Sequence, residues 1–505
     1  MCFNAIFIIT FSTILTFGLM ESFQDAEALK SKGTYLPKYG SATKEIVCGD
    51  RLCSEISNQV KSLHEIDTIS PQDIRSITEK AFIYAYPMIE SYKTMYNAAV
   101  DESSELYVTP FNILHHNEGL STPDDSWVTT PNSDTIYSRA WLDLQVEPVI
   151  LTLPAIEQDR YYTFQLTDFH TNNFGYLGTR TTGNDGGIFM VAGPNWNGEL
   201  PDDVEQTHQA ETDIVILFGR TQVKHQDDVQ NALDVMEKYD LKTLSEYLGE
   251  KQPETAHVID YIPWDEQKAY TSEFVNYVNL ILTWSDIHPS EKQLYEEFVK
   301  IGITPGETAE FDESQKIIMD EATISAFDTI SKNILEQEFK NGWFVPQFFG
   351  DREFHGTNFL NRSTGALYGL YGNTIEEALY IGGLVDIEKN ILDGSKSDYI
   401  IKFSEEPPVG AFWSVTMYDQ ENRLLVENSV DRWLVNSLTG LEKNDDGSFV
   451  IYVQHEPPSE DKRNNWLPAP DGPIYMVHRL YLPDQTIIDG TWEPPVIEKV
   501  GSENQ

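Results

Sequence analysis

The sequence predicts a mixed, mainly β protein: an N-terminal β-sandwich module with a helical preface, a mainly helical middle segment and a C-terminal jelly-roll-like β-sandwich. Near both ends of the chain, apolar and polar residues alternate in short runs, which is typical of strands. Between about residues 227 and 340 the apolar residues recur every three or four positions, which is typical of helices. The 505 residues also exceed what a single core usually supports, so several domains are expected.

Residues 1–28 are predicted to be a signal peptide. Ala5–Met20 is almost wholly apolar and is followed by Ala26-Glu27-Ala28, an A-x-A cleavage pattern. This run of about 16 residues is shorter than the roughly 20 that span a bilayer. No Lys or Arg precedes it, so an uncleaved N-terminal anchor is the alternative. Residues 29–69 are polar and aperiodic and are expected to form an extended leader, and no later stretch is apolar enough to span a membrane.

Two cysteines follow in the leader, Cys48 and Cys53, with Gly49-Asp50 between them. In an oxidising compartment this close pair favours a small disulfide loop. Metal binding is the alternative, but no second cysteine pair or nearby histidine supports it. A loop this small contributes little stability and would act as a local staple.

A helical preface is predicted to begin at Ser70. Ser70 can cap the helix, Pro71 suits its first turn and Asp73 suits its positive end. Pro87 falls inside the pattern and should kink or split the helix, because proline lacks the backbone donor. The apolar face, expected to be core, comprises Ile74, Ile77, Ala81, Tyr84, Met88, Tyr92, Met95 and Ala99.

The preface opens the N-terminal module, residues 70–250, whose later part has a period of two. In Arg160–Asp168, the residues Tyr162, Phe164 and Leu166 face one way and polar residues face the other, which predicts a half-buried antiparallel strand. The other strands expected here are Val149–Pro154, Ile188–Ala192 and Asp213–Gly219.

The middle segment, residues 251–391, should be mainly helical, and the C-terminal module, residues 392–505, mainly strands. The expected helices are 227–240, 265–284, 290–300, 312–340 and 374–391, the fourth with an apolar face of Ile317, Ile324, Phe327, Ile330 and Ile334. The expected C-terminal strands are Tyr399–Ser404, Phe412–Tyr418, Arg423–Glu427, Phe449–Gln454 and Tyr475–Leu482.

A first group of polar residues comprises Asn132, Asp134, Tyr137 and Arg139. A carboxylate with a neighbouring amide and phenol could hold a hydroxylated ligand or a hard cation such as Ca²⁺. Alternatively, Asn132 and Asp134 form Asx turns after Pro131 and bind their own backbone.

A second group, Asp168, His170, Asn172, Asn173 and Arg180, lies where a strand ends and a loop begins. His170 could act as a base that Asp168 orients. We expect Asp168 and Arg180 to share one polar site, because a carboxylate and a guanidinium form a strong bidentate pair. The alternative is a buried polar network that only fixes the loop.

A third group lies in the C-terminal module, where aromatic rings beside amides and guanidinium groups could line a ligand pocket. Trp413 shares a strand face with Val415 and Met417 and is therefore expected in the core. Arg479 and Tyr481 share the face of Val477, which indicates an interface or pocket. The group comprises Trp413, Tyr418, Asp419, Asn428, Arg432, Asn465, Trp466, Arg479, Tyr481 and Trp492.

Two sets of motifs resemble known families. TPNSDTIYSRAWLDL and DRYYTFQLTDFHTNNFGYLGTR resemble the domain of unknown function 1254. PPVGAFWSVTMYD, LLVENSVDRW, NNWLPAP and HRLYLP resemble its usual companion, the domain of unknown function 1214. The resemblance covers roughly residues 74 to 500 and implies a bacterial-type, β-rich protein that is often exported or associated with the cell envelope. It implies no agreed activity.

Composition and missing motifs exclude several classes of function. The chain carries 35 Lys and Arg against 81 Asp and Glu, a net charge of −46, which disfavours nucleic acid and anionic membrane surfaces as partners. It contains no nucleophile elbow, zincin pair, Walker loop or dinucleotide fingerprint, which argues against α/β-hydrolases, zincins and nucleotide enzymes. The sequence leaves open a metal cofactor such as Ca²⁺ and whether the protein forms a homo-oligomer.

Two functional hypotheses remain for a secreted, periplasmic or cell-envelope protein. In the first, the protein binds a glycan or small polar ligand through Asn132, Tyr137, Asn172, Asn173, Tyr418, Arg479 and Tyr481. In the second, it is a hydrolase- or lyase-like enzyme that uses Asp134, Asp168, His170 and Arg180. A cleft joining groups of both β-modules would favour the enzyme.

The N-terminal pattern gives a first testable prediction. The mature protein should begin near Leu29 and carry a Cys48–Cys53 disulfide, because the signal and the cysteine spacing both indicate an oxidising compartment. Intact-mass analysis of secreted material, with and without reductant and alkylation, measures both features. Two free thiols or a retained Met1 would contradict the prediction.

Overall fold

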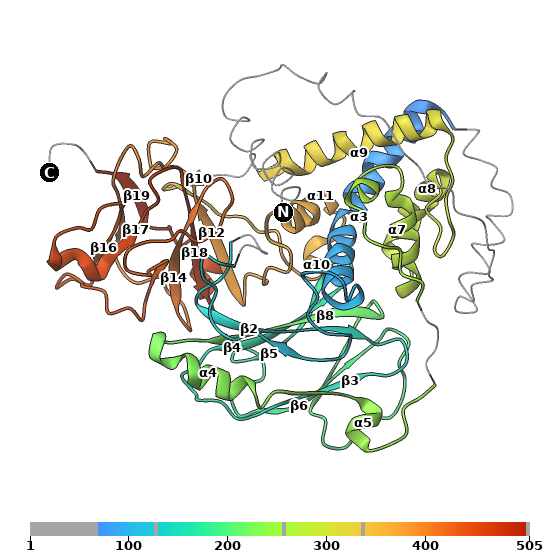
Figure 1. The fold of residues 1–505 in the computed structure, drawn as a ribbon, viewed down its shortest axis with the longest axis horizontal. Coiled ribbons are helices and arrows are strands. Elements are labelled where there is room, and N and C mark those ends of the chain that lie inside the picture. Colours follow the sequence, from blue (N-terminus) through green and yellow to red (C-terminus); the bar gives the residue numbers. More distant parts are fainter. Residues whose placement is uncertain (1–68, 126–129, 255–258, 335–338, 501–505) are drawn as a thin grey trace.

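The computed structural model describes residues 69–125, 130–254, 259–334 and 339–500. The predicted signal peptide, the leader and the Cys48–Cys53 pair lie outside these residues. Two β-sandwiches lie side by side, and a helical layer covers one face of the N-terminal sandwich (Figure 1). The predicted mixed, mainly β architecture is confirmed.

The N-terminal sandwich packs a five-stranded sheet on a four-stranded sheet. The first has the order β1 (His115–His116), β2 (Thr135–Asp143), β8 (Ile214–Gln222), β4 (Tyr162–Asp168), β5 (Asn173–Gly178). The second has the order β7 (Gln206–Gln209), β6 (Gly187–Ala192), β3 (Val149–Leu153), β9 (Asp240–Thr243). Between them lies a core that includes Leu142, Leu151, Phe164, Val191 and Leu217. The flanking helices are η3 (Gln226–Asp228), α4 (Val229–Met236) and α5 (Leu244–Leu248).

Strand β4 departs from the prediction of a half-buried strand, because all seven of its residues are buried. Tyr162, Phe164 and Leu166 face the sandwich core, as predicted. The opposite face carries Thr163, Gln165 and Thr167, which the helical layer and neighbouring loops cover. This second face is therefore a buried polar surface, and its groups need partners.

The helical layer is built around α3 (Pro71–Met95), which continues as a π-helical turn, η2 (Tyr96–Val100). Ser70 caps α3 by accepting a hydrogen bond from the Asp73 amide at 3.1 Å, as predicted. The predicted apolar face is buried from Ile74 to Ala99. The remaining helices of the layer are α6 (Glu266–Ala269), α7 (Phe274–Ile281), η4 (Leu282–Trp284), η5 (Pro289–Glu291), α8 (Lys292–Phe298), η6 (Val299–Ile301), α9 (Glu313–Asn333), α10 (Arg352–His355) and α11 (Phe359–Gly369).

Helix α3 runs unbroken through Pro87, so the predicted split does not occur. Proline cannot donate to the carbonyl four residues earlier, which belongs to Ile83. The Ser363 hydroxyl of α11 donates to that carbonyl instead, and the Arg362 guanidinium donates to the Tyr84 carbonyl at 3.0 Å. The Ser363 hydroxyl therefore replaces the hydrogen bond that Pro87 removes, and both side chains tie α11 to α3.

The buried face of α9 differs from the predicted one. Ile317 and Ile324 are exposed, whereas small residues such as Ala322 and Ala326 are buried. α9 packs against α3, and small side chains allow two helices to approach closely. The predicted face is therefore confirmed at Ile330, which is buried, and wrong at Ile317 and Ile324.

The C-terminal sandwich packs a six-stranded sheet on a four-stranded sheet. The first has the order β10 (Phe339–Lys340), β11 (Trp343–Phe344), β12 (Ala378–Gly383), β18 (Ile474–Tyr481), β14 (Trp413–Asp419), β15 (Leu434–Asn436). The second has the order β17 (Trp466–Pro468), β16 (Phe449–Gln454), β13 (Tyr399–Phe403), β19 (Val496–Lys499). Trp413, Val415 and Met417 lie in its core, as predicted. Two short helices, η8 (Glu460–Asn465) and α12 (Gln485–Ile488), complete it.

Two predicted elements of this region are wrong. The expected helix 374–391 is instead β12 with flanking turns, because 378–383 pairs along its whole length with β18. Residues 423–427 form no strand and contribute one isolated bridge, Tyr418 to Leu425. In the first case long-range pairing overrides a local helical pattern. Among the described residues, no helix has both the length and the apolar character to cross a membrane.

Helix α3 supplies a stability prediction. Met88→Asp should lower the free energy of unfolding by at least about 3 kcal/mol, because Met88 is 0% exposed and the carboxylate would be buried unpaired. Chemical denaturation followed by circular dichroism measures the change. The matched control is Ile324→Asp on α9, a site 69% exposed, which should cost no more than about 0.5 kcal/mol. Equal stability of the two variants would contradict the burial of the α3 face.

Candidate functional site

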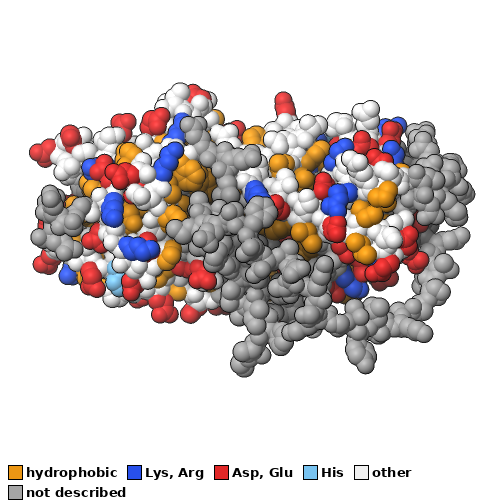
Figure 2. All heavy atoms as spheres, turned by 90° about the horizontal axis from the view of Figure 1, so that it is seen from above, with side chains coloured by type: hydrophobic (Ala, Val, Ile, Leu, Met, Phe, Trp, Pro, Cys, Tyr) orange, Lys and Arg blue, Asp and Glu red, His pale blue; other side chains and the backbone are white. Residues whose placement is uncertain are grey.

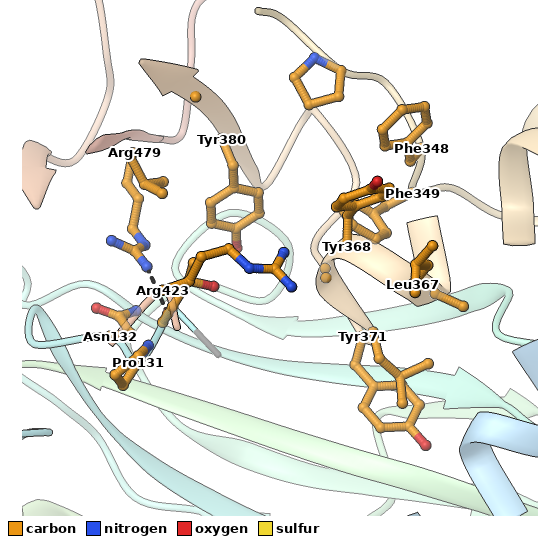
Figure 3. Close-up of a pocket in the computed structure, with 18 of the residues that line it drawn as sticks. Pro131, Asn132, Phe348, Phe349, Leu367, Tyr368, Tyr371, Tyr380, Arg423 and Arg479 are labelled. Carbon is orange, nitrogen blue, oxygen red and sulfur yellow. Dashed lines mark hydrogen bonds between the residues drawn. The ribbon is translucent and has the colours of Figure 1, made fainter. Parts of the chain in front are cut away.

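A cavity of about 510 Å³ lies where the two sandwiches and the helical layer meet. Strands β2 and β8 of the N-terminal sandwich, β12 and β18 of the C-terminal sandwich, and helices α3 and α11 all contribute to its lining. Figure 3 shows side chains of β12, β18, α11 and the neighbouring loops around this space, among them Tyr380, Arg479 and Leu367. Since each part supplies only a portion of the surface, the cavity depends on all three.

One side of the cavity, the polar wall, comprises Asn132, Tyr137, Arg220, Tyr380 and Arg479. Strand alternation explains the direction of these side chains. In β8, Val215 and Leu217 point into the sandwich core, so Arg220 lies on the opposite face. In β12, Leu379 and Ile381 point into the C-terminal core, so Tyr380 faces the cavity.

Arg220 is 5% exposed and has only neutral partners. Its guanidinium donates to Gln165 Oε1 at 2.7 Å, Asn373 Oδ1 at 3.2 Å and the Tyr371 carbonyl at 3.2 Å. Among the described residues, no carboxylate pairs with it, and its buried Nε has no hydrogen-bond partner. The full positive charge is therefore buried at the cavity without a counter-charge in contact.

Arg479 is 4% exposed and is held by side chains and backbone of both sandwiches. It donates to Thr416 Oγ1 at 2.8 Å, to the Tyr418 hydroxyl at 2.8 Å and to the Thr130 carbonyl at 3.1 Å. The nearby Asp134 carboxylate interacts with it electrostatically without a direct hydrogen bond. Its position is therefore fixed before any ligand arrives.

The phenol of Tyr380 lies within the electrostatic reach of both arginines. It accepts a hydrogen bond from Asn373 Nδ2 at 2.6 Å. Burial raises the pKa of Tyr380, while Arg220 and Arg479 oppose that rise. The phenol therefore stays protonated near neutral pH and can donate to a group in the cavity.

The lining has a charge balance opposite to that of the whole chain. Among the described residues that line the cavity, the acidic side chain is Glu90, whereas five are basic: Lys93, Arg139, Arg220, Arg423 and Arg479. The chain as a whole has a net charge of −46, and Figure 2 shows acidic side chains scattered across the face in view. Positive charge is thus concentrated at this cavity.

The opposite side, the apolar wall, comprises Phe344, Phe348, Phe349, Leu367 and Leu370. The Phe349 ring lies against two glycines at the end of α11. A Cβ built on Gly369 would be 3.1 Å from the ring, and one on Gly372 would be 2.4 Å from it. The missing side chains therefore make room for Phe349 beside the cavity.

Below the polar wall, a buried polar contact surface joins the two sandwiches, and we call it the seam. Ser414 Oγ donates to Asp134 Oδ2 at 2.5 Å, and Asn132 Nδ2 donates to the Tyr481 hydroxyl at 3.0 Å. Burial raises the pKa of Asp134, and Arg479 opposes this rise. The Tyr418 hydroxyl also donates to the Pro131 carbonyl at 2.7 Å.

Comparison with known proteins gives two family matches. Residues 111–243 match the model described as protein of unknown function DUF1254, and residues 377–485 match the one described as protein of unknown function DUF1214. The chain carries both of these domains. The DUF1254 segment holds Arg220 and most of the N-terminal sandwich, and the DUF1214 segment holds Tyr380 and Arg479.

The fold is also similar to that of a solved structure, and a second solved structure matches with a lower score. The VPA0106 protein from Vibrio parahaemolyticus is 28% identical, with a TM-score of 0.69 over 85% of this chain and 100% of that one. An uncharacterised protein from Burkholderia cenocepacia is 12% identical, with a TM-score of 0.42 over 89% of this chain and 99% of that one. No curated protein sequence matches this chain.

The structure brings the first predicted group together with Tyr418, Arg479 and Tyr481 of the third across the seam. Asn132, Tyr137 and Arg479 line the cavity, while Asp134, Tyr418 and Tyr481 lie behind them. The Asx turn is present at Asn132, whose Oδ1 accepts from the Asp134 amide at 2.8 Å. The Asp134 side chain instead accepts a hydrogen bond from Ser414 of the C-terminal sandwich. The predicted Asx turn is therefore present at Asn132 but not at Asp134.

The second group lies elsewhere, at the β4–β5 turn. Asp168 accepts from the Asn172 backbone amide at 2.8 Å and from its side-chain amide at 3.0 Å. Asn173 Oδ1 accepts from Gln165 and Thr167. His170 is 3% exposed, and burial lowers its pKa to about 3. These contacts match the alternative of a buried network that fixes the loop.

The predicted Asp168–Arg180 pair is wrong. Thr167 pairs with Asn173 at one end of the β4–β5 hairpin, and Thr163 pairs with Gly178 at the other. Asp168 therefore belongs to the first end and Arg180 to the second, separated by most of the strand length. Arg180 pairs instead with Glu377 at 2.7 Å, a buried residue of the DUF1214 segment. The four residues suggested as catalytic consequently do not share one place.

Sequence reasoning missed Arg220, Tyr380 and Phe349. Arg220 lies just after Gly219, where the predicted strand stopped, whereas β8 continues to Gln222. The sequence did contain one signal for Arg220: it continues the alternation of inward-facing and outward-facing residues beyond the predicted end of the strand. Tyr380 was hidden by the predicted helix, and nothing local to the Phe349 sequence indicates a cavity.

The cation considered from the sequence has no evident site. Among residues 69–125, 130–254, 259–334 and 339–500, no three His, Cys, Asp or Glu side chains are grouped so that they could hold a metal ion. The seam places Asp134 beside hydroxyls and near Arg479, an arrangement that suits hydrogen bonding instead.

The β4–β5 turn gives a pH-dependent prediction. Burial raises the pKa of Asp168 from 3.8 to about 6, so between these values the unfolded carboxyl is ionised and the folded one protonated. This group therefore makes the protein more stable as the pH falls from about 6 to 4, by up to about 3 kcal/mol. Asp168→Asn should remove that contribution, because an amide does not titrate.

The measurement is the free energy of unfolding of both proteins at pH 7 and pH 4. Titration of buried histidines such as His170 shifts both proteins equally and cancels in the comparison. An identical pH dependence of the two would contradict the raised pKa of Asp168.

Proposed function

We propose that the protein binds a small anionic molecule in the cavity between its two β-sandwiches. The buried Arg220 is the observation that carries this proposal. Burying a charge without a compensating partner is costly, and proteins normally pair such groups. Arg220, which lines the cavity, instead has neutral hydrogen-bond partners, and its Nε is buried without a partner. A bound anion would supply the missing counter-charge.

The other basic residues support the same kind of ligand. Arg479 is held in place by three oxygen atoms of the two sandwiches, which leaves it ordered at the cavity. Guanidinium groups present paired donors that match carboxylate, sulfate and phosphate oxygens. Arg423 lies over the Tyr368 ring, 5.7 Å from its centre, and adds a third guanidinium.

The cavity has a size that suits a small molecule. Its volume of about 510 Å³ falls within the usual range of roughly 300–1,000 Å³ for such sites. The sequence indicated a glycan or another small polar ligand, and this proposal specifies an anion. A neutral glycan is the alternative ligand that the experiment must exclude. Export to the periplasm, envelope or medium remains a proposal from the N-terminal sequence pattern.

An enzyme is the second candidate, because the cavity does join groups of both β-modules. The described lining contains no Asp or His, so proton transfer there would involve the phenols of Tyr137 and Tyr380 or the Glu90 carboxylate. Chemical conversion of a bound anion, followed by NMR over hours, would favour this candidate over a binding protein.

Arginine variants test the binding proposal. Phosphate, sulfate, acetate and benzoate would be titrated in low salt by ligand-detected NMR, with methyl glucoside as the neutral probe. At least one anion should bind, and Arg220→Gln should weaken it about tenfold or more through the lost charge-assisted contact. Arg423→Gln, at a half-buried residue, should weaken it in the same direction with less risk to the fold.

The matched control is Arg463→Gln, an exposed arginine of η8 that does not line the cavity. It removes the same charge and should leave anion binding unchanged. Equal loss in the control would mean that only the net charge matters. Binding of methyl glucoside that is insensitive to both cavity variants, without any anion binding, would overturn the proposal in favour of a neutral glycan.

A further inference from the structure

We infer that the ligand is an amphipathic carboxylate, whose anionic group meets the polar wall while an aromatic or aliphatic body meets the apolar wall. This inference rests on the proposed function and specifies its ligand class. It follows from the separation of two chemically different surfaces within one cavity.

The polar wall is built to receive a carboxylate. Arg220, Arg479 and Tyr380 line the same cavity, and both guanidinium groups oppose the rise in the pKa of the Tyr380 phenol that its burial causes. The Tyr137 hydroxyl belongs to the same cluster and accepts from Asn132 Nδ2 at 3.3 Å. The two guanidinium groups and the phenol hydroxyls supply donors of the kind that a carboxylate oxygen accepts.

The apolar wall offers no comparable donors. Its side chains come from segment 344–349 and helix α11, and Phe349 and Leu367 are only partly buried by the protein itself. Phe349 is packed against Gly369 and Gly372, so this surface is formed without a ligand. Apolar side chains that line a preformed cavity favour an apolar ligand group, because contact removes both surfaces from water.

Figure 3 shows the two walls facing each other across the cavity. Arg479, Tyr380 and Asn132 lie on one side, and Phe348, Phe349 and Leu367 lie on the other. Arg423 reaches into the space between them from above Pro131, in contact with the Tyr368 ring. A small inorganic anion would contact only the polar wall, so the second wall is explained by a ligand that extends from one side to the other.

A series of carboxylates tests this inference. Acetate, butyrate, hexanoate, octanoate and phenylacetate would be titrated by ligand-detected NMR, together with hexanamide and phenylacetamide as neutral partners. Affinity should rise by about two- to fourfold for each methylene that becomes buried, until the apolar wall is covered. Each amide should bind at least about tenfold more weakly than its acid, because the charge-assisted contacts are lost.

Variants assign the two effects to the two walls. Leu367→Asn should flatten the dependence on chain length while leaving acetate affinity unchanged. Arg220→Gln should weaken all the carboxylates by a similar factor and keep their order. The matched control, Leu438→Asn, changes a leucine of the C-terminal sandwich that is 43% exposed and does not line the cavity, and it should change neither result. Circular dichroism confirms that each variant is folded.

The outcomes separate the two proposals. If acetate or phosphate binds in an Arg220-dependent manner but chain length has no effect, the amphipathic ligand class is overturned and anion binding stands. If no anion binds, both the anion-binding proposal and the amphipathic ligand class are overturned. If amides bind as well as acids and Leu367→Asn weakens both, the cavity is an apolar site and the role of the arginines is overturned.

Discussion

The seam between the sandwiches is the contact on which the site depends. Asp134 lies 1% exposed and accepts from Ser414, so a carboxylate of one sandwich is solvated by a hydroxyl of the other. Removing either partner would leave a buried polar group unsatisfied, which costs more than the hydrogen bond itself gains. Because these bonds are directional, the seam fixes the ends of β2 and β18 relative to each other. The seam therefore also sets the position of Arg220 relative to Arg479.

The helical layer supplies the third side through a different kind of contact. α11 carries part of the apolar wall. Its Ser363 binds the Ile83 carbonyl that Pro87 leaves without its usual donor, and its Arg362 binds the neighbouring Tyr84 carbonyl. A proline that would weaken an isolated helix thus leaves an acceptor for a neighbouring one. The position of the apolar wall is set by backbone groups of α3, and α3 in turn is held by its buried apolar face.

Local patterns predicted the surfaces of individual strands well, and relations between distant segments poorly. Alternation along residues 474–481 correctly placed Arg479 and Tyr481 on a face away from the core, and capping residues marked the start of α3. The partners of those faces depend on contacts about 350 residues apart, such as Asn132 with Tyr481, which no local pattern encodes. Arg180 illustrates the same limit. Asp168, on the other side of the same loop, was expected as its partner, whereas in the folded protein Arg180 pairs with Glu377.

The contrast between an acidic chain and a basic cavity bears on how an anion would bind. A net charge of −46 repels anions at long range, but salt screens that repulsion over about 8–10 Å. Within the cavity the nearest charges dominate, since low-dielectric walls strengthen the field of buried groups such as Arg220 and Arg479. An anion should therefore associate slowly at low salt but bind tightly once it is inside the cavity. The selectivity among anions should depend on their shape and on contact with the apolar wall. Raising the salt concentration would then accelerate association by screening the acidic surface, while it weakens the buried contacts much less.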